Sequence, residues 1–391
     1  MSFEEVRPDA KQNWIGVADT DFDSLLPLID KRTKAGANKQ LERAIFRTFS
    51  RGVSTQRDEW VYDFSQDVLE KKMRFFVDTY ERARKRKGNF EAADIKWDRE
   101  LAKYRDRSIP KRFEPGAIVM SLYRPFCRLP FYFDRHFNGM IYQWDNLSRS
   151  GDASNHFILY TQPGSQKPFM VGASNTICDL HYVGAAAATE CLPLYSFDDR
   201  GGRLENITDW ALEQFRKHYE SGRDKKHAIT KETIFHYVYG VLHDPVYCEK
   251  YTLNLKREFP RIPFYKDFWQ WAEWGKELMD LHIGYESVTL ANLKRIDLPD
   301  EKARKAGLPP KCILKADKEG GRIVVDSETT LTLSRPKLGN TDSATAPRLN
   351  GFSTSTKKRN PKTQPSAKSS TPTALRSTRK KRSTCLNELL R

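Results

Sequence analysis

The composition of this chain changes abruptly at residue 336, and the change limits how much of the chain can form a packed core. Residues 336–391 contain a single aromatic residue, Phe352, and are rich in Ser, Thr, Pro, Lys and Arg. Such a segment has too little apolar surface to offset the entropy lost on folding, so we expect it to be a disordered tail. The remaining 335 residues are long enough for two or three domains.

The positive charge of the chain is concentrated in the same tail. The whole chain carries a formal net charge of +16, but residues 336–391 hold 13 Lys or Arg against two acidic residues, Asp342 and Glu388. The preceding part is therefore only mildly basic. A general argument from charge to nucleic-acid binding would apply mainly to the tail.

Cysteine usage and hydropathy favour an intracellular protein. None of the six cysteines forms a C-x-x-C pair or has zinc-site spacing with histidine, so we interpret them as small core residues in a reducing compartment. The N-terminus has no apolar signal segment, and no apolar run approaches the length of about 20 residues that spans a bilayer. We expect a cytoplasmic location and no membrane partner.

Periodicity predicts helices early in the chain and strands after residue 110. An amphipathic helix is expected over 37–50, and a long, highly charged helical stretch over 65–106. Short runs of aromatic and β-branched residues between turn signals then predict strands. These runs are 117–123, 129–134, 156–161 and 168–173.

The clearest helical pattern lies in residues 230–284. Ile234, Tyr237, Val238 and Val241 fall on one helical face, and Asp244-Pro245 is a helix start because Asp caps free amides and Pro fits the first turn. That second helix must stop before residue 260. A third, Trp-rich helix is predicted over about 266–282, ending at Gly284, with a weaker helix at 207–220. Further strands are expected at 287–293, 321–326 and 329–333, so the predicted fold class is α+β.

Signatures of catalysis are missing from the sequence. It has no phosphate-binding G-x-x-x-x-G-K-[ST] loop, no G-x-G-x-x-G, no H-E-x-x-H and no G-x-S-x-G. It also lacks the Asn-Pro-Pro-aromatic element with which amino-methyltransferases hold a flipped-out base. We therefore predict no catalytic residues, no metal site and no enzymatic activity for this chain on its own.

One segment that combines arginines with small hydroxyls is 47–64. Arg47, Arg51 and Arg57, with Thr55, could pair with phosphates or guanine edges, and Gly52 would permit a close backbone turn. The alternative is that Arg57 makes only local ion pairs and that the alternating aromatics at 60, 62 and 64 form the buried face of a strand.

A second such segment is 121–137. Arg124, Arg128 and Arg135 are interleaved with aromatic residues, a pattern suited to contact with the DNA backbone and stacking on bases. The alternative is that the aromatics form core strands and the arginines merely cap them.

Five long segments resemble the C-terminal specificity region of Type ISP restriction-modification enzymes. In order they are 44–64, 121–137, 180–195, 233–264 and 271–286, and the likeness extends from residue 10 to about 339. In that family one polypeptide combines a nuclease, an ATP-driven translocase, an adenine methyltransferase and a target-recognition domain. The resemblance implies a module that reads a short site in double-stranded DNA, with Arg47, Arg51, Thr55, Arg57, Arg124, Arg128 and Arg135 as contact residues.

The resemblance also implies a domain plan and partners. Residues 1–24 would connect to a missing methyltransferase domain, residues 25–200 would form the target-recognition region, and residues 201–335 a helical subdomain with terminal strands, followed by the tail. The implied partner is a methyltransferase-translocase polypeptide encoded upstream. S-adenosylmethionine, ATP and Mg²⁺ would be used there, and this chain needs no cofactor of its own.

The sequence departs from the family pattern after residue 340. We hypothesise that a reading-frame change produced the basic stretch and that a second change near residue 386 restored the frame before the helix-like LNELLR. Three alternatives stay open. The chain could be a component of a site-specific adenine methyltransferase that needs a separate catalytic chain, a non-functional fragment, or a protein-interaction scaffold that docks partners through its Trp-rich helix.

Overall fold

The computed structural model of the chain describes residues 8, 12–14, 18–31, 43–86, 95–148, 155–219, 228–288, 293–317 and 320–333. The expected disordered tail and reading-frame change fall outside the described residues. Two compact units divide at residue 286, so that Met1–Glu286 form unit 1 and Ser287–Arg391 form unit 2. The division differs from the expected boundary at residue 200, because the helices beyond that residue pack on the same core as the strands before it.

A four-stranded antiparallel sheet lies at the centre of unit 1, with the order β2-β8-β5-β6. Its strands are β2 (Ser50–Arg51), β8 (Thr189–Pro193), β5 (Phe157–Thr161) and β6 (Val171–Ser174). Every residue of β5 is buried. Alternate side chains of a strand point to opposite faces, so Ile158 and Tyr160 enter one hydrophobic core while Phe157 and Leu159 enter another. The sheet is therefore covered on both sides.

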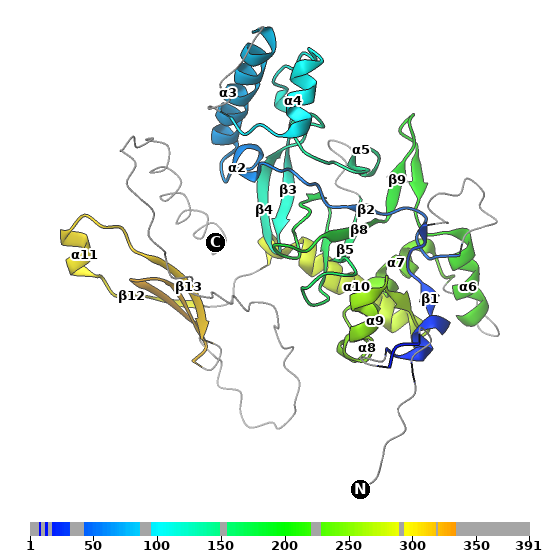
Figure 1. Cartoon of the computed structure of the whole chain (residues 1–391). Helices are drawn as coiled ribbons and strands as arrows, with labels where there is room; N and C mark the ends of the chain where they lie inside the picture. Colours follow the sequence, from blue (N-terminus) through cyan, green and yellow to red (C-terminus); the bar gives the residue numbers. More distant parts are fainter. Residues whose placement is uncertain are drawn as a thin grey trace. The chain divides into compact units, whose positions relative to one another are not determined.

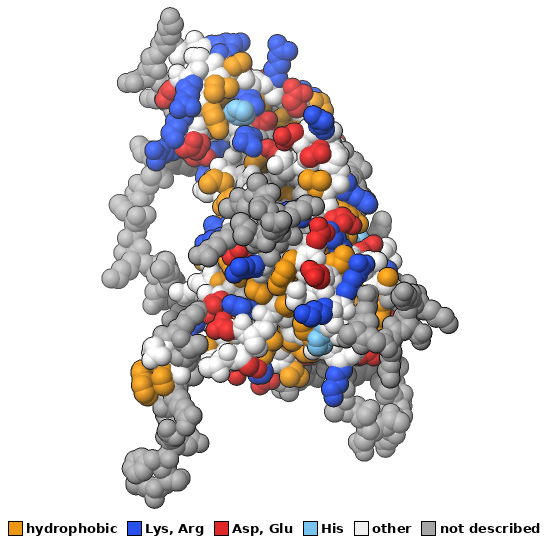
Figure 2. Space-filling view, turned by 90° about the vertical axis from the view of Figure 1, so that its right-hand side faces the viewer, with side chains coloured by type: hydrophobic (Ala, Val, Ile, Leu, Met, Phe, Trp, Pro, Cys, Tyr) orange, Lys and Arg blue, Asp and Glu red, His pale blue; other side chains and the backbone are white. Residues whose placement is uncertain are grey.

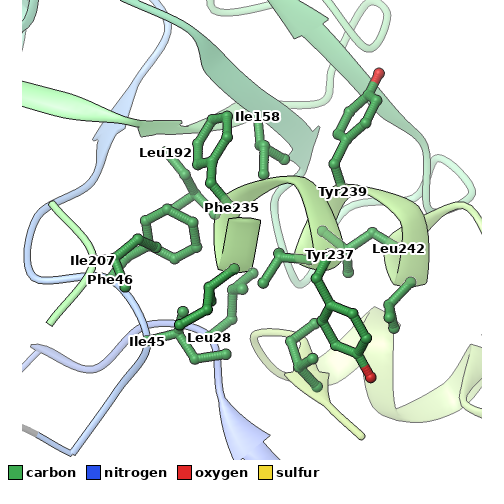
Figure 3. Close-up of a cluster of buried hydrophobic side chains, with 14 of the residues drawn as sticks. Leu28, Ile45, Phe46, Ile158, Leu192, Ile207, Phe235, Tyr237, Tyr239 and Leu242 are labelled. Atoms are coloured by element: carbon green, nitrogen blue, oxygen red, sulfur yellow. The ribbon is translucent and has the colours of Figure 1, made fainter. Parts of the chain in front are cut away.

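The first core joins the sheet to α7 (Lys231–Leu242), nine of whose residues are buried. Figure 3 shows Phe235 beside Ile158 and Leu192 of the sheet, with Phe46 and Ile207 next to it. The N-terminal part of the chain closes this core, since η1 (Thr20–Ser24) places Phe22 inside it. The expected connector 1–24 therefore contributes a core residue at its end. Around it lie β1 (Leu26–Pro27), which pairs with β11 (Arg261–Ile262), and α6 (Asp209–Tyr219).

Two glycines allow α7 and α10 (Phe268–Ile283) to cross closely. A Cβ at Gly275 would overlap the carbonyl of His236, and one at Gly240 would approach the carbonyl of Trp271. Glycine costs helix stability relative to alanine, so its presence at both positions reflects this close approach. The Trp-rich helix is thus fixed by backbone contact, while Trp269 and Trp274 stay exposed.

The second core lies on the other face of the sheet. It is built from α2 (Asp58–Val61), α3 (Gln66–Lys85), α4 (Arg99–Asp106) and the hairpin of β3 (Ile118–Arg124) and β4 (Cys127–Tyr132). The short strand β7 (Ile177–Cys178) pairs in parallel with β3. In Figure 1, α3 and α4 lie beyond the hairpin, on the far side of the sheet from α10. The remaining short elements are η3 (Pro115–Ala117), α5 (Trp144–Leu147), β9 (Tyr195–Phe197) and β10 (Arg203–Glu205).

The predicted strands between 117 and 173 are confirmed as β3, β4, β5 and β6, and the helical stretch predicted over 65–106 is found as two helices, α3 and α4, whereas the helix predicted over 37–50 is wrong in its described part. The described part of 37–50 is not helical, because Phe46 bridges Ile29 and Ile207 and draws this segment into extended pairing. Helix α3 ends at Lys85, and α4 begins only after Asp98, whose side chain accepts a hydrogen bond from the Leu101 amide. The expected alternation of rings at 60, 62 and 64 is broken by α2.

The helical predictions after residue 200 are confirmed in position. Helices α6 and α7 lie where they were expected, and the Asp244 side chain caps α8 (Pro245–Lys250) by accepting from the Val246 amide. The sequence predicted one helix from Asp244-Pro245 to before residue 260, but the structure has two helices there. The backbone of Tyr251 is not helical, and it separates α8 from α9 (Thr252–Arg257). Helix α10 ends at Gly284 as predicted.

Unit 2 is a four-stranded antiparallel sheet with the order β12-β15-β14-β13. It contains β12 (Leu293–Asp297), β13 (Cys312–Asp317), β14 (Arg322–Asp326) and β15 (Thr329–Leu333), with α11 (Glu301–Lys305) after the first strand. The predictions of β14 and β15 are confirmed. Most of the strand predicted at 287–293 lies outside the described residues; at its two ends, Ser287 belongs to η4 (Tyr285–Ser287) and Leu293 begins β12. Strand β13 was not predicted.

Of the five cysteines in the described part, Cys178 and Cys191 are buried as expected, whereas Cys312 is exposed. No helix in the described ranges is long and apolar enough to cross a membrane. The described residues also contain no group of three or more His, Cys, Asp or Glu side chains placed to hold a metal ion.

Candidate nucleic-acid interface

Arg51 stands at the end of the edge strand β2, where the chain leaves the central sheet. Its side chain is 43% exposed, and its Nε lies 3.5 Å from Oε1 of the buried Glu190. The next residue must be glycine, because a Cβ at Gly52 would overlap the Asp179 carbonyl. The sequence predicted that Gly52 would permit a tight turn; in the structure this glycine instead permits a close approach between two backbone segments, which brings Arg51 beside the loop that follows β7.

Arg124 lies next to this loop, in a network of polar side chains. Its guanidinium is 2.6 Å from Oδ1 of the buried Asp179 and 3.9 Å from Oδ2 of Asp58. Asp58 also accepts hydrogen bonds from the hydroxyls of Tyr123, at 3.0 Å, and Thr55. The guanidinium packs over the Tyr123 ring at 3.8 Å. The Arg124 side chain remains 31% exposed, so its buried side is held by Asp179 while its other side faces solvent.

Within this network, the Asp179 carboxyl has a pKa well above the usual value for an aspartate. Burial raises its pKa to about 6, although the pairing with Arg124 and the hydrogen bond from the His181 amide oppose the rise. Nearby Asp58 raises it further. The carboxylate is therefore held at a cost in desolvation, and the charge of Arg124 offsets part of it.

Arg57, which was predicted from the sequence to contact DNA, lies in the interior of unit 1. Only 1% of its side chain is exposed, because the guanidinium donates to the Phe137 carbonyl at 2.9 Å, pairs with Asp98 and packs over the Phe76 ring. Thr55 is likewise buried, with its hydroxyl on Asp58. The local ion-pair interpretation of Arg57 was thus the nearer one, although its partner lies 41 residues away.

Arg128, which was also predicted to contact DNA, binds the C-terminal end of a helix. It donates to the carbonyl of Ile283, the last residue of α10, at 2.7 Å and to Asn175 at 3.1 Å, and it pairs with Glu286 at 3.2 Å. A cation at a helix C-terminus satisfies free carbonyls and the helix dipole. Its side chain is only 16% exposed, so the interpretation that arginines cap the strand region fits this residue.

The last two predicted residues lie apart from the network. Arg135 is 63% exposed and pairs with Asp145 of α5 at 2.6 Å, beyond the far end of β4. Arg47 is half-buried, and its amide donates to the Asn206 carbonyl at 2.9 Å. Of the seven predicted residues, the structure brings Arg51, Thr55 and Arg124 together. The side chains of Arg47, Arg57, Arg128 and Arg135 lie outside the network, although the Arg57 amide donates to the Thr55 hydroxyl at 3.3 Å.

The end of the sheet that carries Arg51 also carries two loops. Residues 162–170 join β5 to β6, and residues 179–188 join β7 to β8; the Gln162 amide donates to the Ala188 carbonyl at 2.9 Å. Lys167, Lys256 and Arg257 are exposed here. The opposite end and the helices beside it carry both signs. Figure 2 shows Lys and Arg interspersed with Asp and Glu on that side of the molecule.

Sequence reasoning missed Asp58, Asp179 and the loop 162–170. Asp58 and Asp179 gave no signal, because their roles depend on contacts with Arg124 across more than 50 residues. The loop did carry one, since Pro163-Gly164 between two strand patterns marks a turn that exposes its neighbours.

Comparison with known proteins decides the family. The model of the Type ISP C-terminal specificity domain matches residues 44–336. The chain belongs to this family. The α+β architecture found here is the fold of that specificity domain.

Solved structures resemble this specificity domain over most of its length. The chain in the cryoEM structure of a DrdV–DNA complex is 41% identical, with a TM-score of 0.75, over 85% of this chain and 33% of that one. A nuclease-deletion mutant of the Type ISP restriction-modification enzyme LlaGI, in complex with a DNA substrate mimic, gives 24% identity and a TM-score of 0.65, over 85% and 25%. The ATP-dependent Type ISP enzyme LlaBIII, bound to DNA, gives 22% and 0.68, over 84% and 21%.

The specificity domain thus spans a third or less of each of these solved chains. A search of curated proteins finds no match.

Proposed function

We propose that this chain binds double-stranded DNA and reads a short sequence in it, and that catalytic domains act on the DNA it has bound. The observation that carries the proposal is the family match over residues 44–336, which covers both the central sheet and the β3–β4 hairpin. The 41% identical DrdV chain was solved in complex with DNA, which supports the same partner for this chain.

The surface that suits DNA best is the loop-bearing end of the central sheet. Arg51 and Arg124 stand there on rigid strands, each oriented by a buried carboxylate. Phosphate contacts from such arginines fix the position of a protein on the duplex, while neighbouring loops can reach base edges. We call this surface, comprising Arg51, Arg124 and the loops 162–170 and 179–188, the loop face.

We further propose that the bound site is presented to a methyltransferase-translocase polypeptide. Reading the site would place its adenine for methylation and decide whether translocation and cleavage begin. The support is that LlaBIII is an ATP-dependent restriction-modification enzyme of which this chain matches 21%. S-adenosylmethionine, ATP and Mg²⁺ would be used by that polypeptide. Supplying it should yield methylation at one site only when this chain is present.

The experiment for DNA reading is selection from a pool of random duplexes with the full chain, followed by affinity measurements across a salt series. Arg51→Ala should weaken binding and reduce the slope of log affinity against log salt by about one, because one phosphate contact is lost. Arg74→Ala is the matched control, since Arg74 on α3 is similarly exposed and paired with Glu70. Equal effects of the two substitutions, or no selected motif in the wild type, would contradict the proposal.

A further inference from the structure

The loop between β5 and β6 is held by its backbone at both ends and in its middle. The Gly164 amide donates to the carbonyl of Lys256 at the end of α9, at 2.7 Å. The Thr161 hydroxyl donates to the Pro168 carbonyl at 3.1 Å and accepts from the Met170 amide at 3.0 Å. The Ser165 hydroxyl accepts from the Lys167 amide at 3.0 Å. The loop therefore has one defined course rather than many.

The side chains at the tip of this loop are directed to solvent instead. Gln166 and Lys167 are exposed, and within the described ranges neither side chain makes a hydrogen bond or an ion pair. A backbone that is already fixed loses little further entropy when a partner binds the side chains it carries, and only the rotamer freedom of Gln166 and Lys167 has to be given up. The tip thus combines order in the main chain with free hydrogen-bonding capacity in the side chains.

The neighbouring loop 179–188 places only small residues beside the side chains of Gln166 and Lys167. Gly184 has a positive φ of 127°, and a Cβ built there would lie 3.7 Å from Cε of Lys167. The following Ala185 and Ala186 are exposed and carry only methyl groups. A flat ligand can therefore approach Gln166 and Lys167 closely, without large side chains in the way.

We infer that Gln166 and Lys167 read base edges in the major groove, with Gln166 selecting adenine. The inference rests on the proposed function and names residues that determine its specificity. A glutamine amide can donate to N7 and accept from the N6 amino group of adenine at once, whereas lysine donates to O6 and N7 of guanine. The methyl groups of Ala185 and Ala186 are suited to the thymine methyl. Arg51, at the same end of the sheet, would supply the phosphate contact.

The test compares duplexes selected by the full wild-type chain with those selected by Gln166→Ala and Gln166→Lys. Gln166→Ala should lower discrimination at one A·T pair by roughly 10- to 100-fold, with affinity for non-specific duplexes unchanged. Gln166→Lys should shift the preference at that pair from adenine toward guanine. The thermal transition of each variant shows that it is folded. The matched control is Gln214→Ala, since Gln214 is a partly buried glutamine of α6 outside the loop face.

Two failures can be told apart. A wild-type motif that both Gln166 variants retain, with unchanged discrimination at every pair, would overturn this inference and leave the proposed function standing. A uniform loss of affinity across all sequences would also overturn it, because that result marks Gln166 as a backbone contact. A wild-type chain that selects no motif would overturn the proposed function and the inference with it.

Discussion

The buried guanidinium of Arg57 and the partly exposed carboxylate of Asp98 form an ion pair that joins the start of α2 to the start of α4. The same carboxylate caps α4 by accepting from the Leu101 amide at 2.7 Å, and the guanidinium also holds the Phe137 carbonyl. Burial lowers the pKa of Arg57, and the nearby Asp98 opposes that effect. An ion pair in this position stabilises the fold. The sequence had suggested a different role for Arg57, contact with DNA, because the residue lies among small hydroxyl side chains.

Replacing Arg57 should lower the free energy of unfolding of the protein. Arg57→Ala leaves the partly buried Asp98 without its partner and removes the contacts of the guanidinium with the Phe137 carbonyl and the Phe76 ring. Breaking a buried pair costs about 3–5 kcal/mol, and because Asp98 is 25% exposed we expect a loss of about 3 kcal/mol. Denaturant unfolding of the full chain measures the loss. Arg135→Ala serves as the control, because its pair with Asp145 is exposed and surface pairs contribute about 1 kcal/mol or less. Similar stabilities for the two variants would argue against a structural role for Arg57.

Gly275→Ala should also destabilise the fold, against the ordinary preference of helices for alanine. The substitution gains about 1 kcal/mol of helix propensity, but the added Cβ overlaps the His236 carbonyl and pushes α10 away from α7. Overpacking of this kind costs about 1–3 kcal/mol or more. Gly116→Ala is the control, since no atom lies within 4 Å of the position its Cβ would take. A rise in melting temperature for Gly275→Ala would refute the close crossing.

Stability should fall in mild acid because of His236. Burial lowers the pKa of this histidine to about 4, and His156 and Lys276 lower it further while Asp280 opposes them. The unfolded chain binds a proton near pH 6.5, so the contribution is present above that pH and is lost as pH falls toward 4. The slope is about 1.4 kcal/mol per pH unit for one such group. His236→Gln should make the stability profile less steep between these values, and the slope that remains is expected from other buried histidines such as His282, whose pKa burial also lowers to about 4. An unchanged slope in this variant would contradict the contribution of His236.

Asp179→Asn should strengthen non-specific DNA binding while keeping the fold. Burial raises the pKa of the Asp179 carboxyl to about 6, so the site stabilises the charged form less than water does, and we expect it to tolerate the uncharged amide. Removing the carboxylate also releases Arg124 for phosphates. Affinity for random duplex should rise a few-fold at neutral pH, with a steeper salt dependence. Glu205→Gln on β10 is a control outside the loop face, and weaker binding by Asp179→Asn would contradict the proposed orientation of this surface.

Sequence alone determined the elements whose signals are local. The strands β3, β4 and β5, the Asp244 cap and the end of α10 at Gly284 follow from periodicity, capping chemistry and turn residues within a few positions of each other. The sequence alone also identified the segments that resemble the Type ISP specificity region, because five long segments in the family's order can be recognised without knowing which residues are in contact.

Tertiary structure decided which arginines reach the surface. Arg51 and Arg57 lie six positions apart among the same small hydroxyls, yet one ends an edge strand while the other is enclosed by Asp98 and Phe137. Burial depends on partners tens of residues away, and no local pattern encodes them. The same holds for Phe46. The sequence predicted a helix at this residue, but in the structure it is extended because it pairs with Ile29 and Ile207. Local chemistry set the elements, and long-range packing set the site.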